Sequence, residues 1–510
     1  MLRAFDWFEP KKALPRLAVD FLLVHACMIA SLAGCLLFHI AIGNGALASV
    51  MIQTLTRYYW QSFLPLSLVF PLTFAMNGFY AKSAGYSNHR KTILVARRVG
   101  ASVLVFLALN YLVFRMQIAP RSVILLFCVL ITLCLSLVRV AKAYVVHHYQ
   151  TANPQVQGPR ANRQILVVGG AGYIGCLLVR RLIEKGYKVR VLDNLMYGDK
   201  AIAALHSNPN FELVRGDCRN IQNVVNAVRG VDAIVDLAAI VGDPACEEDR
   251  QIALEINFAA TRMLIEIAKG YGVQRFIFAS SCSVYGATDA LMDEQSEVCP
   301  ISLYAQTKVD SERVLLESRT AQFHPTVLRL ATVFGNSWRP RFDLVVNLLV
   351  AKAVQEGVIT IFNSEQWRPF IHTRDVAEGI LTVLEAPLAQ ISGEVFNLGD
   401  SRMNVTLAGL ANEIRAQFPG TRLDFRETAD RRNYRVSFEK IEHRLGFRNG
   451  RTLADGIREL KEAFARGDFQ DYTAAEFHNQ KFLRASGSPV SANETDARVM
   501  AAFAGEAGRL

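Results

Sequence analysis

Residues 165–175 read ILVVGGAGYIG, an apolar β-branched run that enters three glycines spaced three residues apart. The run predicts a buried strand, and Gly169, Gly172 and Gly175 predict a tight turn that opens a helix. In such a turn the first glycine permits the bend, the second lets a diphosphate approach the backbone, and the third allows close helix packing. Because N–H groups at a helix N-terminus attract anions, the stretch predicts a dinucleotide site.

The same kind of strand recurs along the chain. Short β-branched runs alternate with amphipathic helical stretches, a pattern typical of a doubly wound parallel sheet covered by helices. The expected strands are residues 165–168, 189–192, 212–214, 233–237, 276–279, 326–328 and 395–398. The predicted fold class is therefore α/β, with a Rossmann-like doubly wound parallel sheet and a smaller C-terminal substrate-binding lobe, largely within residues 335–450.

An acidic residue follows the second expected strand. Asp193 stands 18 residues beyond Gly175, where a carboxylate accepts hydrogen bonds from both hydroxyls of a ribose. Asn194 follows it, and no arginine stands there to pair with a 2′-phosphate. The sequence therefore predicts NAD rather than NADP.

A second motif follows the fifth expected strand, which ends in ASSCSVYG at residues 279–286. Beyond Ser281 comes Tyr304-x-x-x-Lys308, and this spacing places the phenol and the ammonium on one helix face. A free tyrosine has a pKa near 10, but a neighbouring ammonium and an oxidised nicotinamide both favour phenolate. We expect Tyr304 to act as a base and Ser281 to hydrogen-bond the same sugar hydroxyl.

The charges divide the chain into two parts. Residues 1–163 carry 16 Lys and Arg against 3 acids, whereas the remaining 347 residues carry 40 against 43. The basic part is largely apolar between its charges, so a membrane is a better partner for it than nucleic acid. Overall, 51% apolar and 20% charged residues exclude intrinsic disorder.

Four apolar stretches in the basic part approach the ~20 residues that span a bilayer, and residues 21–163 contain no acid. They lie near residues 19–42, 63–80, 99–118 and 122–138. Lys and Arg residues concentrate before the first apolar stretch, after the second and after the fourth. Because positively charged flanks stay on the cytoplasmic side of a membrane, this distribution predicts that both termini are cytoplasmic. Asp20 and His25 fall in the first stretch, where we expect an interfacial location.

These patterns predict a membrane anchor over residues 1–148, a linker over 149–162, an enzyme domain over 163–485 and a flexible tail over 486–510. The nine cysteines form no C-x-x-C pair, which argues against a disulfide framework and a zinc ribbon. No metal site is predicted.

Several motifs together resemble the NAD-dependent epimerase/dehydratase branch of the extended short-chain dehydrogenase/reductase superfamily. They are GGAGYIG, LDN at 192–194, RGD at 215–217, LAA at 237–239, ASSCSVYG and YAQTK. The resemblance implies that Asp217 contacts the adenine, that Asn257 braces the central helix, and that Tyr304 is the base, Lys308 the ribose ligand and Ser281 the proton relay. The full set of cofactor residues that we predict is Gly169, Gly172, Tyr173, Ile174, Gly175, Asp193, Asn194, Asp217, Ala238, Ala239, Tyr304 and Lys308.

The residues before Val284-Tyr285-Gly286 separate the activities within that branch. Sugar dehydratases resemble one another in carrying Thr-Asp-Glu there, whereas this chain has Ser281-Cys282-Ser283. Cys282 and Ser283 stand where dehydratases have the aspartate and the glutamate, and neither residue is a carboxylic acid. The chain is therefore more similar to UDP-galactose 4-epimerases. The predicted function is an NAD-dependent nucleotide-sugar epimerase. The alternatives are a 4,6-dehydratase, a 4-keto reductase and a non-catalytic NAD-binding scaffold for glycosyltransferases.

Two later segments resemble the family's substrate motifs. WRPFIHTRDVAEGI places Arg368 on the substrate diphosphate, and DRRNYRVS supplies Arg432 as a second clamp; Ser281 and Tyr304 complete the predicted substrate contacts. Relatives usually have an asparagine where this chain has Ala331 and Thr332. Trp338, Arg339 and Arg341 are nearby candidates to replace its contacts.

The N-terminal part resembles, more loosely, the four-helix anchor of bacterial polysaccharide-biosynthesis dehydratases and polyprenyl-phosphate sugar transferases. NGFYAKSAGYSNHRK and PRSV carry this resemblance. It implies a multi-pass protein of the bacterial inner membrane, held in the bilayer through residues 19–138 with a cytoplasmic catalytic domain, in surface polysaccharide or lipopolysaccharide synthesis. The epimerase family also implies a homodimer through the helix bearing Tyr304.

Overall fold

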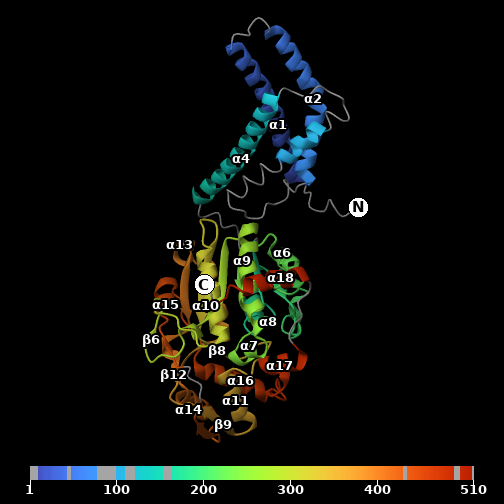
Figure 1. Cartoon of the computed structure of the whole chain (residues 1–510). Coiled ribbons are helices and arrows are strands. Elements are labelled where there is room, and N and C mark those ends of the chain that lie inside the picture. Colours follow the sequence, from blue (N-terminus) through green and yellow to red (C-terminus); the bar gives the residue numbers. More distant parts are fainter. Residues whose placement is uncertain are drawn as a thin grey trace. The chain divides into compact units, whose positions relative to one another are not determined.

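The computed structural model describes residues 10–42, 48–76, 99–108, 121–152, 163–428, 433–487 and 494–507. Contacts divide the chain into two compact units, Met1–Gln157 and Gly158–Leu510 (Figure 1). The first unit is helical where it is described, and the second is α/β. Helix α4 continues through Ala152, so it includes the first residues of the stretch expected to be a linker.

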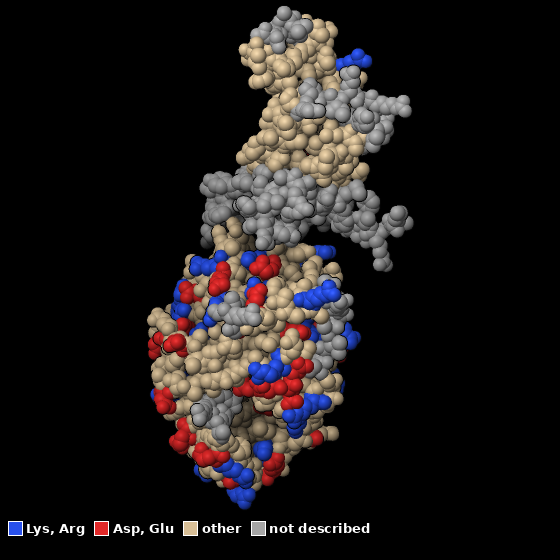
Figure 2. Space-filling view, in the orientation of Figure 1, with Lys and Arg blue, Asp and Glu red and all other residues tan. Residues whose placement is uncertain are grey.

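The N-terminal unit consists of apolar helices with an apolar exterior. Its helices are α1 (Pro10–Ala41), α2 (Ala48–Met76), a short helix over Val99–Ala108, and α4 (Arg121–Ala152). They share a buried core that includes Phe70, Phe106 and Phe127. Among the described residues, 21 of the 27 exposed large hydrophobic side chains lie between Val19 and Val138. Figure 2 shows that this surface is largely free of charged residues, whereas the other unit carries mixed charge.

The prediction of four membrane-spanning helices is not confirmed. Among the described residues one helix, Ala18–Ala41, is long and apolar enough to cross a membrane, and Val99–Ala108 and Ser122–Leu135 are shorter apolar helices. Helix α2, which contains Arg57 and two internal prolines, is not among these helices. Parts of the second and third predicted stretches, residues 77–80 and 109–118, lie outside the described residues.

The second unit is built on a seven-stranded sheet in the order β11-β7-β5-β4-β1-β2-β3, and every pair in it is parallel. Its strands are β1 (Gln164–Val168), β2 (Lys188–Asp193), β3 (Phe211–Arg215), β4 (Ala233–Asp236), β5 (Arg275–Ser281), β7 (His324–Leu330) and β11 (Glu394–Leu398). All seven predicted strands are present. The strand order reverses between β1 and β4, and in such sheets the ligand crevice opens at this point.

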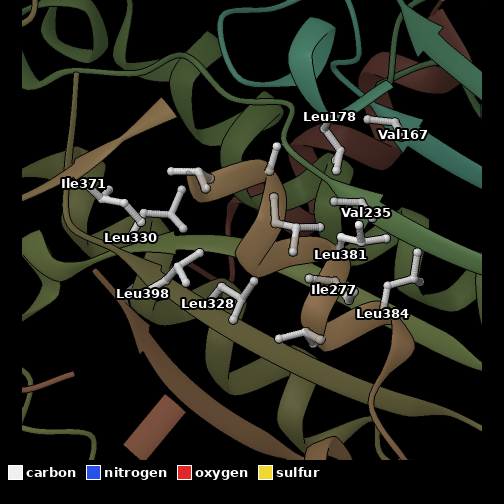
Figure 3. Close-up of a cluster of buried hydrophobic side chains, with 14 of the residues drawn as sticks. Val167, Leu178, Val235, Ile277, Leu328, Leu330, Ile371, Leu381, Leu384 and Leu398 are labelled. Atoms are coloured by element: carbon white, nitrogen blue, oxygen red, sulfur yellow. The ribbon is translucent and has the colours of Figure 1, made fainter. Parts of the chain in front are cut away.

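Helices cover both faces of this sheet and bury separate apolar clusters. The cluster in Figure 3 joins Leu178 and Leu381 from the helices to Val167, Val235 and Ile277 from the strands. The opposite face buries Phe276 and Phe278 with Met263. The helices are α5 (Gly175–Glu184), α6 (Ile221–Val228), α7 (Asp243–Glu248), α8 (Arg250–Leu254), η4 (Glu255–Ala259), α9 (Ala260–Tyr271), α10 (Leu303–Glu317), α12 (Thr373–Glu385) and α13 (Leu388–Ile391), with short turns η3 (Ala203–Leu205) and η5 (Cys282–Tyr285).

A smaller lobe follows β7 and has its own core around Phe334, Phe370 and Ile457. Its strands form a sheet in the order β12-β10-β8 and two strand pairs, β13-β9 and β14-β6. The elements are β6 (Leu291–Met292), β8 (Thr332–Phe334), α11 (Val345–Gln355), β9 (Val358–Phe362), β10 (Trp367–His372), η6 (Ser401–Met403), β12 (Asn404–Thr406), α14 (Leu407–Gln417), β13 (Arg422–Arg426), β14 (Arg435–Val436), α15 (Glu439–Leu445) and α16 (Leu453–Ala465).

The C-terminal residues return to the sheet domain. After η7 (Ala475–Phe477), helix α17 (Asn479–Ser486) packs on α7, and α18 (Glu494–Ala504) packs on η4. Met500 is fully buried in the core that includes α9, and Asp496 accepts a 2.6 Å hydrogen bond from the Asn220 amide. The tail expected to be flexible over residues 486–510 therefore contains a docked helix, because Met500 and Ala504 supply an apolar stripe.

Candidate active site

A cavity of about 700 Å³ lies at the carboxyl ends of the parallel strands. The turns after β1 and β4 and the end of β5 supply one wall, and α10 supplies Tyr304 and Lys308. The smaller lobe supplies the facing wall, including residues of β9, β10 and β13. Side chains from both halves of the fold therefore meet around one space.

The glycine turn is as crowded as the sequence predicts. Gly169 has a φ of +79°, and a Cβ there would lie 2.9 Å from the backbone N of Ala238. A Cβ on Gly175 would overlap the Gly169 carbonyl oxygen, and one on Gly172 would lie 3.2 Å from the same atom. Gly169, Gly172, Tyr173, Ile174 and Gly175 all line the cavity. The backbone at the start of α5 is thus open to a diphosphate, and these residues fit a dinucleotide.

Asp193 ends β2 beside this turn. Its carboxylate accepts hydrogen bonds from the N–H groups of Ala171, at 2.9 Å, and Leu195, at 2.8 Å. Burial raises the pKa of Asp193, while these hydrogen bonds and the Arg339 charge oppose the rise. Asn194 accepts from the Met196 N–H at 3.1 Å. Each carboxylate oxygen keeps a lone pair, so the predicted ribose contact is compatible with this arrangement.

The remaining predicted cofactor residues have different surroundings. Asp217 forms an ion pair with Arg219 at 2.8 Å, and its contact with adenine stays a prediction. Ala239 lines the cavity, whereas Ala238 packs against Gly169. Asn257 lies in the π-helical turn η4 and bonds both backbone groups of Ile240, at 2.8 and 3.0 Å. It therefore braces the central helix against the loop after β4, as the resemblance implies.

The structure brings Ser281, Tyr304 and Lys308 to the same cavity. The Lys308 ammonium donates to the Ala279 carbonyl at 2.8 Å and lies 5.8 Å from the centre of the Tyr304 ring. Ser281 ends β5, and its Oγ accepts a 2.9 Å hydrogen bond from the Ser283 hydroxyl. The Ser281 proton remains available to a ligand oxygen.

Burial controls the ionisation of this group. It lowers the pKa of Lys308 to about 8, and the charge of Asp236 opposes that decrease. Asp236 ends β4 and is itself buried, which raises its pKa to about 6. Burial also raises the pKa of Tyr304, so its phenol is neutral at pH 7 in the free protein. Additional positive charge from a bound nicotinamide is needed to favour the phenolate.

Asp236 is expected to set the alkaline limit of activity through Lys308. As pH rises through about 8 the ammonium loses its proton, and its support for the phenolate disappears. In Asp236→Asn the stabilising negative charge is absent, so the pKa of Lys308 falls and the alkaline limb of the kcat/KM profile moves to lower pH. An unchanged limb would exclude this coupling. The control is Asp232→Asn, because Asp232 precedes the same strand but accepts only from the Gln164 N–H.

Several cavity residues were not predicted. Ser283 and Asp243 approach from the main domain, and Arg426 and Tyr434 from the smaller lobe. The Asp243 charge helps to raise the pKa of Tyr304, after burial and Cys246. Two of them had a signal in the sequence: Ser283 is close to Ser281, and Tyr434 lies within the DRRNYRVS motif. Asp243 and Arg426 reach the cavity through the fold and had none. Cys282, by contrast, is buried, and its thiol donates to the Arg329 carbonyl at 3.3 Å.

The predicted substrate residues are placed in part. Arg368 lines the cavity beside Tyr434, and its guanidinium donates to the Trp367 carbonyl at 2.9 Å and to the Gln366 side chain at 3.1 Å. Arg432 lies outside the described residues. Ala331 and Thr332, which stand where relatives usually have an asparagine, also line the cavity. The structure therefore places Arg368 in the cavity wall, and the diphosphate contacts of Arg368 and Arg432 stay predictions.

Sequence and structure comparisons find related proteins. The model of the NAD dependent epimerase/dehydratase family matches residues 165–399. The putative UDP-glucose 4-epimerase of Methanocaldococcus jannaschii is 29% identical over 302 residues, covering 58% of this chain and 86% of that protein. The dTDP-glucose 4,6-dehydratase of Streptomyces niveus is 30% identical over 323 residues, covering 59% and 92%. The UDP-glucuronic acid 4-epimerase of Bacillus cereus, solved with UDP-glucuronic acid and NAD, superposes with a TM-score of 0.54 at 25% identity, covering 59% and 99%.

Proposed function

Because this chain belongs to the NAD dependent epimerase/dehydratase family, we propose that it is a nucleotide-sugar epimerase that inverts one ring carbon through a transient ketone. Family membership confirms the prediction of NAD as cofactor. The observation that carries the proposal is the convergence of Ser281, Tyr304 and Lys308 in one cavity with no carboxylate at positions 282 and 283. Dehydration needs an acid and a base beside the sugar, and a thiol and a hydroxyl do not replace them.

The cavity residues have separate tasks in this reaction. Bound NAD supplies reversible hydride acceptance at the sugar carbon. Tyr304 removes the proton of the sugar hydroxyl and later returns it, while the Lys308 ammonium favours the phenolate. Ser281 hydrogen-bonds the same sugar oxygen. Arg368, at the opposite wall, pairs with the diphosphate, which leaves the sugar free to present either face.

The test is product analysis with a panel of substrates. Full-length protein purified in detergent is incubated with UDP-, dTDP- and GDP-sugars, and the products are resolved by NMR. We expect an epimer of one substrate, with no net change in NADH absorbance. A 4-keto-6-deoxy product would identify a 4,6-dehydratase, which the Streptomyces relative makes the second candidate. Stoichiometric NADH consumption would identify a reductase. The absence of any product across the panel would favour the non-catalytic scaffold.

We also propose that the N-terminal unit anchors the enzyme in the bacterial inner membrane, with the catalytic domain in the cytoplasm. The support is the exposed apolar surface between Val19 and Val138, together with one helix of spanning length and the cations that flank these helices. A role in surface polysaccharide or lipopolysaccharide synthesis and a homodimer belong to the same proposal.

The anchor predicts how the protein fractionates. We expect the chain to stay with the membrane pellet after an alkaline carbonate wash and to leave it only with detergent. A reporter fused after the catalytic domain should remain inaccessible to protease added outside intact spheroplasts. Release by carbonate alone would show peripheral attachment and would contradict the anchor.

A further inference from the structure

One buried arginine of the cavity is left without an anionic partner. Arg339, in the loop between β8 and α11, is only 7% exposed and lines the cavity. Its Nε forms no hydrogen bond, and its Nη2 donates to the neutral amide of Asn479 at 2.8 Å. Among the described residues, no carboxylate forms an ion pair with it. Burial lowers the pKa of Arg339 to about 10, which shows the cost of desolvating this charge.

The neighbouring arginine has a different environment. Arg341 is buried to the same extent, but Asp343 accepts two hydrogen bonds from it, at 2.9 and 2.7 Å. The Arg341–Asp343 ion pair therefore has a net charge close to zero. The positive charge that this loop presents to the cavity therefore comes from Arg339, which the Asp343 charge attracts but with which no described carboxylate forms an ion pair.

The loop that carries Arg339 is fixed on the N-terminus of α5. The Ser337 hydroxyl donates to the Tyr173 carbonyl at 2.6 Å and lies 3.2 Å from the Cys176 thiol, in the first turn of the helix. The Tyr173 hydroxyl in turn donates to the Gly335 carbonyl at 2.7 Å. The helix end with its open backbone N–H groups and the arginine loop thus form one local structure.

The side chain also lies on the side of the cavity expected to hold the cofactor. Its guanidinium stacks on the Tyr197 ring, 3.8 Å from the centroid, and Tyr197 follows β2 four residues after Asp193. The pKa of the Asp193 carboxyl is raised by burial, and the positive charge of Arg339 opposes that rise. Arg368, from β10, belongs to the smaller lobe. Two arginines are therefore available for two diphosphates.

Helix α17 holds Arg339 in this position. Asn479 accepts from Arg339, and it donates through its own amide to the Val241 carbonyl at 3.2 Å. Phe482 of the same helix packs on Tyr197, the ring on which Arg339 stacks, with ring centroids 4.8 Å apart. Arg484 attaches the end of the helix to α7 through Glu248 at 2.6 Å. This helix lies beyond residues 165–399 that the family model matches.

We propose that Arg339 binds the diphosphate of NAD, opposite the N-terminus of α5, and that α17 acts as a latch that positions this arginine and slows cofactor release. The inference rests on the NAD dependence of the family and is independent of which sugar reaction follows. A guanidinium can donate two parallel hydrogen bonds to phosphate oxygens, and the free Nε is one of the available donors.

The test measures cofactor binding without turnover. Apo full-length protein in detergent is titrated with NAD by calorimetry, and the dissociation rate is measured by stopped-flow fluorescence of NADH. Loss of one charged hydrogen-bonding group at a phosphate weakens binding roughly 10- to 100-fold, and we expect Arg339→Gln to raise the Kd for NAD by that factor. The Kd of this variant for ADP-ribose, which retains the diphosphate, should rise by the same factor. Asn479→Ala should raise the NADH dissociation rate roughly 3- to 10-fold, and Arg339→Lys should recover part of the affinity.

Arg180→Gln is the matched control. Arg180 stacks at 4.5 Å on Trp338, the residue before Arg339, but it donates to the Ala201 carbonyl and does not line the cavity. It should bind NAD with wild-type affinity. A Kd for NAD within twofold of wild type in Arg339→Gln would overturn the proposal, as would a loss for NAD that ADP-ribose does not share. An unchanged Kd for NAD with a raised KM for the nucleotide sugar would assign the arginine to the substrate and also overturn it.

Discussion

Replacing Tyr304 by Phe is expected to reduce kcat by about 10²- to 10⁴-fold while NAD still binds with wild-type affinity. The phenolic hydroxyl is the only group of Tyr304 that is removed, and the ring that fills this part of the cavity remains. Burial keeps the free phenol neutral, so its proton transfer depends on the combined charge of Lys308 and the cofactor. The measurements are single-turnover kinetics with the substrate found in the panel and calorimetry with NAD.

The control for this variant is Tyr271→Phe, at the end of α9 outside the cavity, which should leave kcat unchanged. A Tyr304→Phe protein that turns over at the wild-type rate would remove the acid/base role and would favour the scaffold alternative. A parallel loss of NAD affinity would instead show that the phenol serves mainly in cofactor binding, and the assignment of Tyr304 as the base would fail.

Glu312→Ala is expected to have the largest effect on stability, about 3–5 kcal/mol of the free energy of unfolding. Glu312 lies one turn after Lys308 on α10 and forms a buried ion pair with Arg329 of β7 at 2.7 Å. Ser280 of β5 donates to the same carboxylate. Truncation leaves the Arg329 charge buried without its partner. The measurement is urea unfolding of the full chain in detergent, followed by circular dichroism.

Two further variants separate the ion pair from general damage. Glu317→Ala removes an exposed carboxylate from the last turn of the same helix and should change stability by less than ~0.5 kcal/mol. The double variant Glu312→Leu/Arg329→Met removes both charges and should recover much of the loss, since apolar replacements of a buried pair are often tolerated. If Glu312→Ala unfolds like wild type, the pair does not fix α10 on the sheet.

The parts of this fold that the sequence predicted are those that local pattern determines. Buried parallel strands are continuous apolar runs, so all seven were identified, and the glycine turn needed only its own residues. The spacing of Tyr304 and Lys308 placed them on one helix face. Ser281 follows closely on the fifth expected strand, which placed its hydroxyl at the carboxyl edge of the sheet.

The contributions from distant segments could not be predicted in this way. Asp236 looked like the end of an ordinary strand, and its effect on Lys308 follows from burial of both groups. Arg339 was named as a candidate contact from its own loop, but the sequence did not indicate that Asn479 of α17, 140 residues away, would bond it. The apolar windows of the N-terminal unit predicted helices where helices are described, but among the described residues one helix, Ala18–Ala41, is long and apolar enough to span a membrane.

Helix α18 has a practical consequence for anyone who trims this protein. Met500 is fully buried, and its helix packs on the turn that contains Asn257. A recombinant fragment that stops before α18 would leave the apolar surface that Met500 and Ala504 cover facing water, and such fragments tend to precipitate during expression. Affinity tags are better attached at the other terminus, and crystallisation trials are better begun with every residue through Ala504 retained.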